Sequence, residues 1–246
     1  MRNLKMILEF DGSRYKGWQK QPDNDLTVEG KIESALSKMV GETIEAEGCV
    51  RTDVGVHAEN YMANFHTDCD LSIEAIMDYL NGELPDDIAV KSMADASEKF
   101  HSGYNIKSIT YVYKISNKEL RNVFNRKYVY NSEEKLNLEE MKNTAEYLVG
   151  THDFQYLATV PTNIKSTIKT INYINIIELE ESMIEIEINA DDFLWNMVKI
   201  IVGSLIEVGK GNITALDIEN LLIETEASAY IPMAKSKGLS LRGVEY

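Results

Sequence analysis

The segment Arg51-Thr52-Asp53-Val54-Gly55-Val56-His57-Ala58 lies between two stretches whose residue pattern predicts strands. We expect one strand over 42–50 and the other over 61–67. A short connection between two strands exposes a side chain while the strands aim it, so Asp53 is well placed to act on a ligand. Asp and Gly also suit turns, and a hairpin tip with a solvated Asp53 explains the spacing equally well.

The composition is that of a globular protein with one large domain or two small ones. The chain has 246 residues, of which 44% are hydrophobic and 26% are charged. Its most apolar stretch, 193–208, contains polar and charged residues, which favours a buried helix over a membrane span. The first ten residues alternate like a strand and lack the small-residue cleavage site of a signal peptide.

Cysteine and histidine usage argues against a metal site. Cys49 and Cys69 fit no CxxC or metal-ligand spacing, and the four histidines are scattered with no HExxH motif. We therefore expect no metal ion. The two isolated thiols are typical of a reduced, cytoplasmic protein.

Charge is distributed unevenly along an acidic chain with a formal net charge of −15. A strongly acidic protein does not usually bind a polyanion, because phosphate contacts need Lys and Arg. The stretch 106–130 is the exception, with six basic residues and one acid, Glu119. Such a basic face is compatible with nucleic-acid binding, although solvated strand ends guarded by lysines would give the same pattern. The six basic residues are Lys107, Lys114, Lys118, Arg121, Arg126 and Lys127.

The order of elements predicts an α+β fold made of two β-α-β-β-α-β halves. In the first half we expect strands over 4–10, 42–50, 61–67 and 88–93, and helices from Thr27 to Gly41 and over 72–80. In the second half we expect strands over 108–115, 169–179, 183–190 and 239–245, and helices over 138–149, 193–208 and 215–223. This pattern suggests two ferredoxin-like halves, 1–105 and 106–246, joined into one mainly antiparallel sheet. Helices would cover one face and leave the other face for an active cleft.

The octapeptide resembles the RTDxGVH motif of the TruA family of tRNA pseudouridine synthases. Further blocks follow in the family's order along essentially the whole chain. These blocks are 10–19 (FDGSRYKGWQ), Phe100-His101, 150–154 (GTHDF), 197–203 (MVKIIVG) and Gly238-Leu239.

The resemblance implies isomerisation of uridine to pseudouridine in the anticodon stem-loop of tRNA, by a homodimer that needs no metal or cofactor. The glycosidic C–N bond must break and a C–C bond must form at the same sugar carbon. By resemblance Asp53 either attacks the anomeric carbon or removes the 2′ proton to give a glycal, and the sequence does not choose between them. A paired uridine must first leave its stack.

The resemblance also implies roles in base flipping and substrate binding for five other residues. Arg51 would occupy the space left by the flipped base, although a simple ion pair is the alternative. Tyr111 would stack on the target base, although a core tyrosine is the alternative, and Tyr113 is the better candidate for the core. Lys199 would pair with the catalytic carboxylate. His57 and Leu239 complete the predicted set of substrate-binding residues.

Several positions depart from the family's pattern. Lys199 stands where the family usually has arginine, and lysine lacks the bidentate fork. Gly103 replaces an arginine that follows the Phe-His pair. Three alternatives therefore stay open beside an active synthase: a divergent paralogue that acts on another RNA, a catalytically inactive RNA-binding protein, and a carboxylate-dependent nucleoside hydrolase that would release free uracil.

Overall fold

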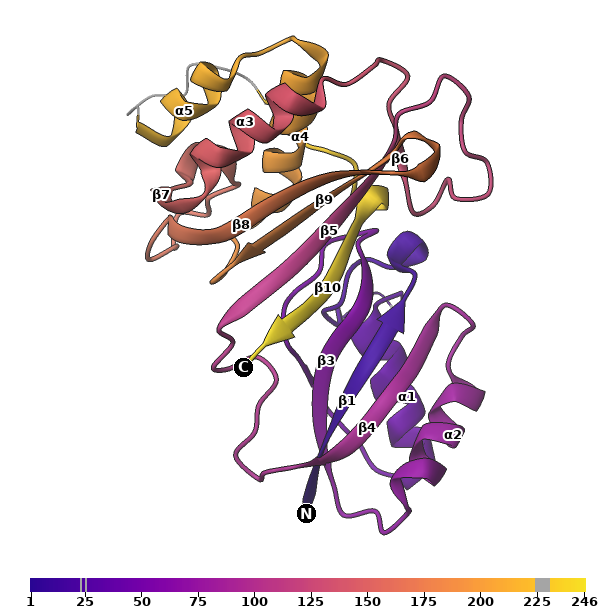
Figure 1. Ribbon diagram of the computed structural model, residues 1–246. Coiled ribbons are helices and arrows are strands. Elements are labelled where there is room, and N and C mark those ends of the chain that lie inside the picture. Colours follow the sequence, from indigo (N-terminus) through magenta and orange to yellow (C-terminus); the bar gives the residue numbers. More distant parts are fainter. Residues whose placement is uncertain (23, 25, 224–230) are drawn as a thin grey trace. The chain divides into compact units, whose positions relative to one another are not determined.

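The chain divides into two compact units, each described here by itself. The computed structural model describes all residues except 23, 25 and 224–230 (Figure 1). Unit 1 comprises Met1–Lys107 and Ser240–Tyr246, and unit 2 comprises Ser108–Leu239. The described residues form ten strands, paired mostly antiparallel, and five α-helices. This mixed make-up confirms the expected α+β class.

Unit 1 is a sheet with two helices on one face (Figure 1). Strand β1 pairs antiparallel with both β4 and β3, and the free edge of β3 carries two further strands. Strand β2 pairs with β3 at 63–65, and β10 pairs parallel with β3 at His57 and Ala58. The last strand therefore lies beside the start of β3. The elements are β1 (Arg2–Phe10), α1 (Val28–Val40), β2 (Ala46–Gly48), β3 (His57–Thr67), α2 (Ile73–Glu83), β4 (Ile88–Ala96) and β10 (Leu239–Glu245).

Register and caps explain why these residues form this unit. Leu4 pairs with Phe65 and Leu8 with Tyr61, and all four side chains are buried on one face of the sheet. Helix α1 begins at the expected cap, where the side chain of Thr27 accepts a hydrogen bond from the N–H of Gly30. It ends at Gly41, whose φ of 77° closes the last turn.

The predicted strand 42–50 is wrong over most of its length. Only Ala46–Gly48 pairs as a strand, because α1 takes the preceding backbone donors. The N–H of Ile44 donates to Ser37 Oγ at 2.9 Å, and the N–H of Ala46 donates to Glu33 Oε1 at 3.1 Å. These side-chain bonds replace a strand ladder. Strand β3 in turn begins at His57 and not at 61.

Unit 2 contains four antiparallel strands in the order β5-β9-β8-β7, with the short β6 parallel to the end of β5. Strands β6 and β7 were not predicted, since two and four residues give no readable alternation. The elements are β5 (Ser108–Ser116), β6 (Tyr130–Asn131), α3 (Leu138–Leu148), β7 (Gly150–Asp153), β8 (Ile168–Leu179), β9 (Met183–Ala190), α4 (Met197–Lys210) and α5 (Ala215–Ile223).

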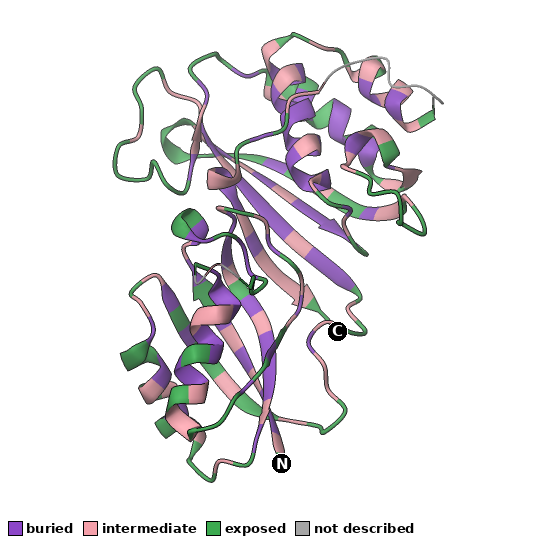
Figure 2. Cartoon of the chain, turned by 180° about the vertical axis from the view of Figure 1, so that it is seen from behind, coloured by how far each residue is buried: buried purple, intermediate pink, exposed green. Residues whose placement is uncertain are grey.

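Helix α4 is the most buried helix of unit 2. It starts at Met197 and not at 193, because Asn196 adopts φ 62° and cannot continue a right-handed helix. Eleven of its fourteen residues are buried, as expected for a stretch that is apolar nearly all round. Figure 2 shows buried residues following the strands and this helix, with exposed residues on loops and outer helix faces. None of the helices in the described part of the chain is long and apolar enough to cross a membrane.

Candidate active site

The Asp loop, residues 49–56, joins β2 to β3 in unit 1 and is fixed by backbone hydrogen bonds. The carbonyl of Thr52 accepts from the N–H of Trp18 at 3.2 Å, and the N–H of Gly55 donates to the carbonyl of Tyr15 at 3.3 Å. Within the loop the N–H of Val56 donates to the carbonyl of Asp53 at 3.1 Å and closes a turn. The backbone is thus held on both sides of Asp53.

Two glycines let the segment 12–18 approach the Asp loop closely. A Cβ on Gly12 would lie 1.9 Å from the carbonyl oxygen of Val56. A Cβ on Gly17 would lie 2.4 Å from the carbonyl oxygen of Thr52, and Gly17 also has a φ of 92°. No larger residue fits either position without displacing the loop backbone.

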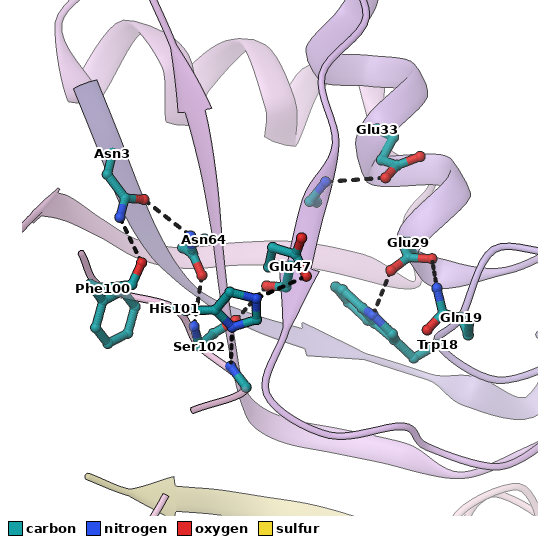
Figure 3. Close-up of polar contacts among 12 residues, drawn as sticks. Asn3, Trp18, Gln19, Glu29, Glu33, Glu47, Asn64, Phe100, His101 and Ser102 are labelled. Carbon is teal, nitrogen blue, oxygen red and sulfur yellow. Dashed lines mark hydrogen bonds and ion pairs between the residues drawn. The ribbon is translucent and has the colours of Figure 1, made fainter. Parts of the chain in front are cut away.

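Two aromatic residues, Trp18 and Tyr61, hold the Asp loop. The rings of Trp18 and Tyr61 are stacked with centroids 4.1 Å apart, and the hydroxyl of Tyr61 donates to the carbonyl of Val50 at 2.5 Å. The indole N–H of Trp18 donates to Glu29 Oε1 at 3.1 Å (Figure 3). Helix α1 therefore reaches the Asp loop through Trp18.

Glu29 gathers three donors at the base of this support. Besides the indole of Trp18, it accepts from the side-chain amide of Gln19 at 2.8 Å (Figure 3). It also accepts from the backbone N–H of Lys20. Burial raises the pKa of Glu29, while the hydrogen bonds from Lys20 and Trp18 act in the opposite direction. The carboxylate fixes the course of the chain from 18 to 20.

His57 lies at the end of the Asp loop and is only 4% exposed. The N–H of Gly12 donates to its Nδ1 at 3.1 Å. Asp11 Oδ1 lies 3.2 Å from the same nitrogen and accepts from the N–H of Ser13 at 2.9 Å. His57 therefore ties the end of β1 to the start of β3.

The side chains at the front of the Asp loop differ in exposure. Arg51 and Val54 are exposed, Asp53 is half-buried, and Thr52 is buried. Among the described residues, Thr52 Oγ1 is one of three buried side-chain oxygens that make no hydrogen bond. A half-buried carboxylate on a fixed backbone can act as a nucleophile or as a general base.

The other expected site residues belong to unit 2. Tyr111 lies on β5, is buried, and meets the ring of Phe193 edge-on with centroids 5.5 Å apart. Lys199 lies in the first turn of α4 and is buried, and its carbonyl accepts from the N–H of Ala234 at 2.9 Å. Leu239 is buried at the start of β10.

Tyr113, two residues further along β5, has a structural environment. Its hydroxyl donates to the carbonyl of Lys235 at 2.9 Å, and burial raises its pKa. A Cβ on Gly238 would lie 2.7 Å from this ring, so the chain before Leu239 packs directly on Tyr113. This agrees with the expectation that Tyr113 belongs to the core.

Arg51 and Asp53 lie on the Asp loop, and His57 directly follows the loop as the first residue of β3. The residues that hold this loop, above all Gly12, Glu29 and the Asp11 carboxylate, were missed as site residues. Asp11 and Gly12 entered the sequence analysis only as part of the family block 10–19, without a role of their own. Glu29 gave no signal at all, since an acid in the first turn of a helix is ordinary. No cluster of His, Cys, Asp or Glu suited to a metal ion occurs among the residues that the structure describes.

Comparison with known proteins gives consistent matches. A family model described as tRNA pseudouridine synthase matches residues 6–105 and 144–246. The chain is 55% identical to tRNA pseudouridine synthase A 1 of Clostridium tetani over 246 residues, covering all of both chains. Over the same full lengths it is 43% identical to tRNA pseudouridine synthase A 2 of Bacillus cereus and 39% identical to tRNA pseudouridine synthase A of Clostridium acetobutylicum.

Proposed function

This chain belongs to the tRNA pseudouridine synthase family, an isomerase family, and from that premise we propose that Asp53 starts the reaction on uridines of the anticodon stem-loop. One observation carries the assignment. Asp53 is the half-buried carboxylate of a loop whose backbone is held by Tyr15, Trp18 and its own turn. A fixed backbone positions a reacting group without loss of entropy at the moment of reaction.

The chemistry needs one carboxylate and conserves all atoms of the nucleoside. In one route Asp53 attacks C1′ of the ribose, the C1′–N1 bond breaks, and uracil leaves as an anion. In the other route Asp53 removes the 2′ proton while the same bond breaks, which leaves a glycal. In the first route C5 of the rotated uracil displaces the Asp53 carboxylate from C1′, and in the second route C5 bonds to C1′ of the glycal as a proton returns to C2′. In both routes C5 then loses its proton to water, and N1 takes up a proton.

We assign supporting roles on the resemblance and on local environment. Arg51 is exposed on the same loop and would fill the space of the flipped base. Tyr111 would stack on the uracil, with its ring oriented by Phe193. Lys199 would stabilise the carboxylate of Asp53, Leu239 would contact the substrate, and His57 would act through the loop it anchors.

Tritium release from tRNA transcript labelled with [5-³H]uridine tests the assignment. We expect release by the wild type, at most about 10⁻³ of that rate for Asp53→Asn, and unchanged transcript binding. The matched control is Asp70→Asn, which changes an exposed carboxylate of the same unit and should release tritium at the wild-type rate. Release by Asp53→Asn at the wild-type rate would refute the role of Asp53.

The two routes differ in the fate of the 2′ hydrogen. Transcript deuterated at C2′ should react at the same rate as unlabelled transcript if Asp53 attacks C1′. A severalfold slower reaction would indicate that the 2′ proton is removed. The measurement uses single-turnover conditions, so that product release does not mask the chemical step.

Product analysis separates the synthase from the alternatives. A nucleoside hydrolase would release free uracil, whereas a synthase leaves pseudouridine in the chain. Binding without tritium release from any tRNA would instead favour a paralogue with another RNA target or an inactive RNA-binding protein. Mapping the modified positions tests the anticodon stem-loop directly.

Lys199 offers a test of the departure from the family's usual arginine. Arginine keeps the charge and adds a bidentate donor set, so Lys199→Arg should be neutral or activating. Lys199→Met removes the charge and should slow the reaction. A tenfold loss with Lys199→Arg would mean that the pocket is built around lysine.

We further propose a cytoplasmic homodimer in which the halves 1–105 and 106–246 both contribute to substrate binding. Both cysteines are free thiols, which suits a reducing compartment. Light scattering coupled to gel filtration measures the oligomeric state, and a monomer at the concentration used for activity would refute the dimer.

A further inference from the structure

An exposed apolar group occupies the 118–128 loop of unit 2, between β5 and β6. Leu120 is 84% exposed, Val123 63% and Phe124 94%. Single exposed apolar side chains are ordinary, but three within five residues, including a phenyl ring with almost no protein contact, indicate an interaction site.

The base of this loop is well structured. Asn117 donates through its amide to the carbonyls of Ser132 and Glu134 at 3.2 and 2.6 Å, and its Oδ1 accepts from the N–H of Leu136 at 3.0 Å. The N–H of Ser132 also donates to the carbonyl of Ser116 at 2.9 Å. The two ends of the loop are thus clamped by one asparagine.

The tip of the loop is folded on itself. The N–H of Tyr128 donates to the carbonyl of Asn125 at 2.9 Å, and the N–H of Asn125 donates to Asn122 Oδ1 at 3.1 Å. Arg126 donates to the carbonyl of Val123 at 3.0 Å. These local hydrogen bonds hold the turn without any contact from the Phe124 ring, which is left exposed.

Basic residues flank Phe124 in the sequence. The loop contains Lys118, Arg121, Arg126 and Lys127 and one acid, Glu119, although the whole chain has a net charge of −15. Lys118 lies 2.9 Å from Glu181 and Arg121 lies 3.2 Å from Glu133. These pairs are largely exposed, so each contributes little to stability and a phosphate can replace the carboxylate.

A second group of cations lies near Arg121. The pKa of Lys237 is lowered, first by burial and then by repulsion from Lys235 and Arg121. The turn that carries these lysines is held by the hydroxyl of Tyr113, which donates to the carbonyl of Lys235. Cations held together against their mutual repulsion form a site that a phosphate group would stabilise.

We propose that the 118–128 loop, with Lys235 and Lys237, is an RNA-binding surface on which Phe124 stacks against an unpaired base of the tRNA while the cations bind its backbone phosphates. An aromatic ring with flanking Arg and Lys is the combination that binds single-stranded nucleic acid without reading its sequence. A contact with a second copy of the chain is less suited, because protein interfaces are depleted in lysine and in charge at their core. The proposal rests on the proposed function, and it adds a contact that no catalytic role requires.

The aromatic contact is tested by binding of unmodified tRNA transcript at fixed salt. Phe124→Ala should weaken binding roughly tenfold, the order expected for one lost base–aromatic stack, while Phe124→Trp should bind as tightly as the wild type. The matched control is Leu216→Ala, which removes an exposed apolar side chain of α5 in the same unit and should bind like the wild type.

The phosphate contacts are tested by the salt dependence of the same binding constant. Arg121→Ala and Lys237→Ala should each lower the slope of log K against log salt by about 1, whereas Phe124→Ala should leave the slope unchanged. Lys142→Ala removes an equal charge from the outer face of α3 and should not change the slope. A slope that responds equally to all three charge substitutions would mean that only net charge matters, and would overturn the proposal.

Tritium release and oligomeric state measured on the same samples separate the possible failures. If the wild type is active and Phe124→Ala binds transcript normally, the RNA surface is refuted and the proposed function stands. If Phe124→Ala changes the oligomeric state, the loop is a contact between copies and the proposal is overturned. If binding depends on Phe124 but the wild type releases no tritium, the surface stands and the proposed function fails.

Discussion

The Asp loop and the 118–128 loop differ in what holds them in place and in how far their side chains are exposed. The Asp loop packs against the segment 12–18 so closely that a Cβ on Gly12 has no room, and its Thr52 is buried. The 118–128 loop is fixed at its base by Asn117 and leaves its apolar tip exposed. Under the two proposals, the loop that aims a carboxylate is held by neighbouring segments, and the loop that offers a binding surface is held mainly by its own hydrogen bonds. Substitutions should therefore affect stability in the first loop and binding in the second.

Gly12→Ala should have the largest effect on stability and turnover, because alanine cannot fit where Gly12 lies against the Asp loop. The new Cβ would lie 1.9 Å from the carbonyl oxygen of Val56, so the Asp loop must move. We expect a loss of about 1–3 kcal/mol in the free energy of unfolding. A displacement of about 1 Å at Asp53 should slow turnover roughly 100-fold. Urea unfolding and single-turnover tritium release measure the two effects.

Gly82→Ala is the matched control for this substitution. Gly82 lies in α2 of the same unit and is exposed, and a Cβ added there would meet no atom within 4 Å. Alanine there should stabilise the protein by up to about 1 kcal/mol and leave turnover unchanged. Equal turnover of the Gly12→Ala protein and the wild type would show that the close approach does not position Asp53.

His57→Leu should be the next most damaging change. Leucine leaves the buried N–H of Gly12 without its acceptor, and an unsatisfied buried donor costs about 1–3 kcal/mol. His57→Asn can place an oxygen near the position of Nδ1 and should recover part of that loss. The informative measurement is kcat together with KM. A positioning role predicts that kcat falls with little change in KM and partly recovers with asparagine, whereas a direct contact with RNA predicts a rise in KM for both variants.

The sequence predicted those features that depend on interactions between residues close together in the chain. Local signals were sufficient for α1, whose caps Thr27 and Gly41 were both correct, and for the long alternating strands. The predicted strand 42–50 failed because Glu33 and Ser37, on the preceding helix, capture its backbone donors. Such a capture depends on tertiary packing, which a single sequence does not reveal.

The candidate site shows the same limit. The octapeptide, by resemblance, predicted the family, which the comparisons confirm, and it predicted Asp53 as the reacting carboxylate, which stays a prediction. The supports of the loop come from three other segments, with Glu29 on α1, Tyr61 on β3 and Asp11 at the end of β1. None of these has a distinctive residue type or spacing, so only the folded chain reveals them.

The buried thiol of Cys49, at the start of the Asp loop, should make a smaller contribution to the pH dependence of the free energy of unfolding. Burial raises the pKa of this thiol from 9.0 to about 12. The folded state keeps a proton that the unfolded state releases, so the stabilisation is complete below pH 9 and is lost as pH rises toward 12. The slope attributable to Cys49 should approach about 1.4 kcal/mol per pH unit and be absent in Cys49→Ala.

Urea unfolding of both proteins between pH 8 and pH 10 measures this difference, below the range in which buried tyrosines dominate. The rate of Cys49 modification by a thiol reagent sharpens the comparison of the two loops. A locked Asp loop predicts that Cys49 reacts only as fast as the whole unit unfolds. Reaction that is much faster than global unfolding would mean that the Asp loop opens by itself, and the contrast with the 118–128 loop would then be one of degree.

Phe124→Ser should have the smallest effect on stability, and this near absence of an effect is itself the prediction. A ring that is 94% exposed has little buried area to lose, so the free energy of unfolding should change by less than about 0.5 kcal/mol. Urea unfolding tests this against Phe65→Ser, where the ring is fully buried in β3 and several kcal/mol should be lost. A large loss at Phe124 would mean that the ring is covered in solution, by another copy or by the chain itself. A stable Phe124→Ser protein with weakened RNA binding would instead support the contrast between the two loops. The Phe124 ring would then contribute to RNA binding and not to the stability of the fold.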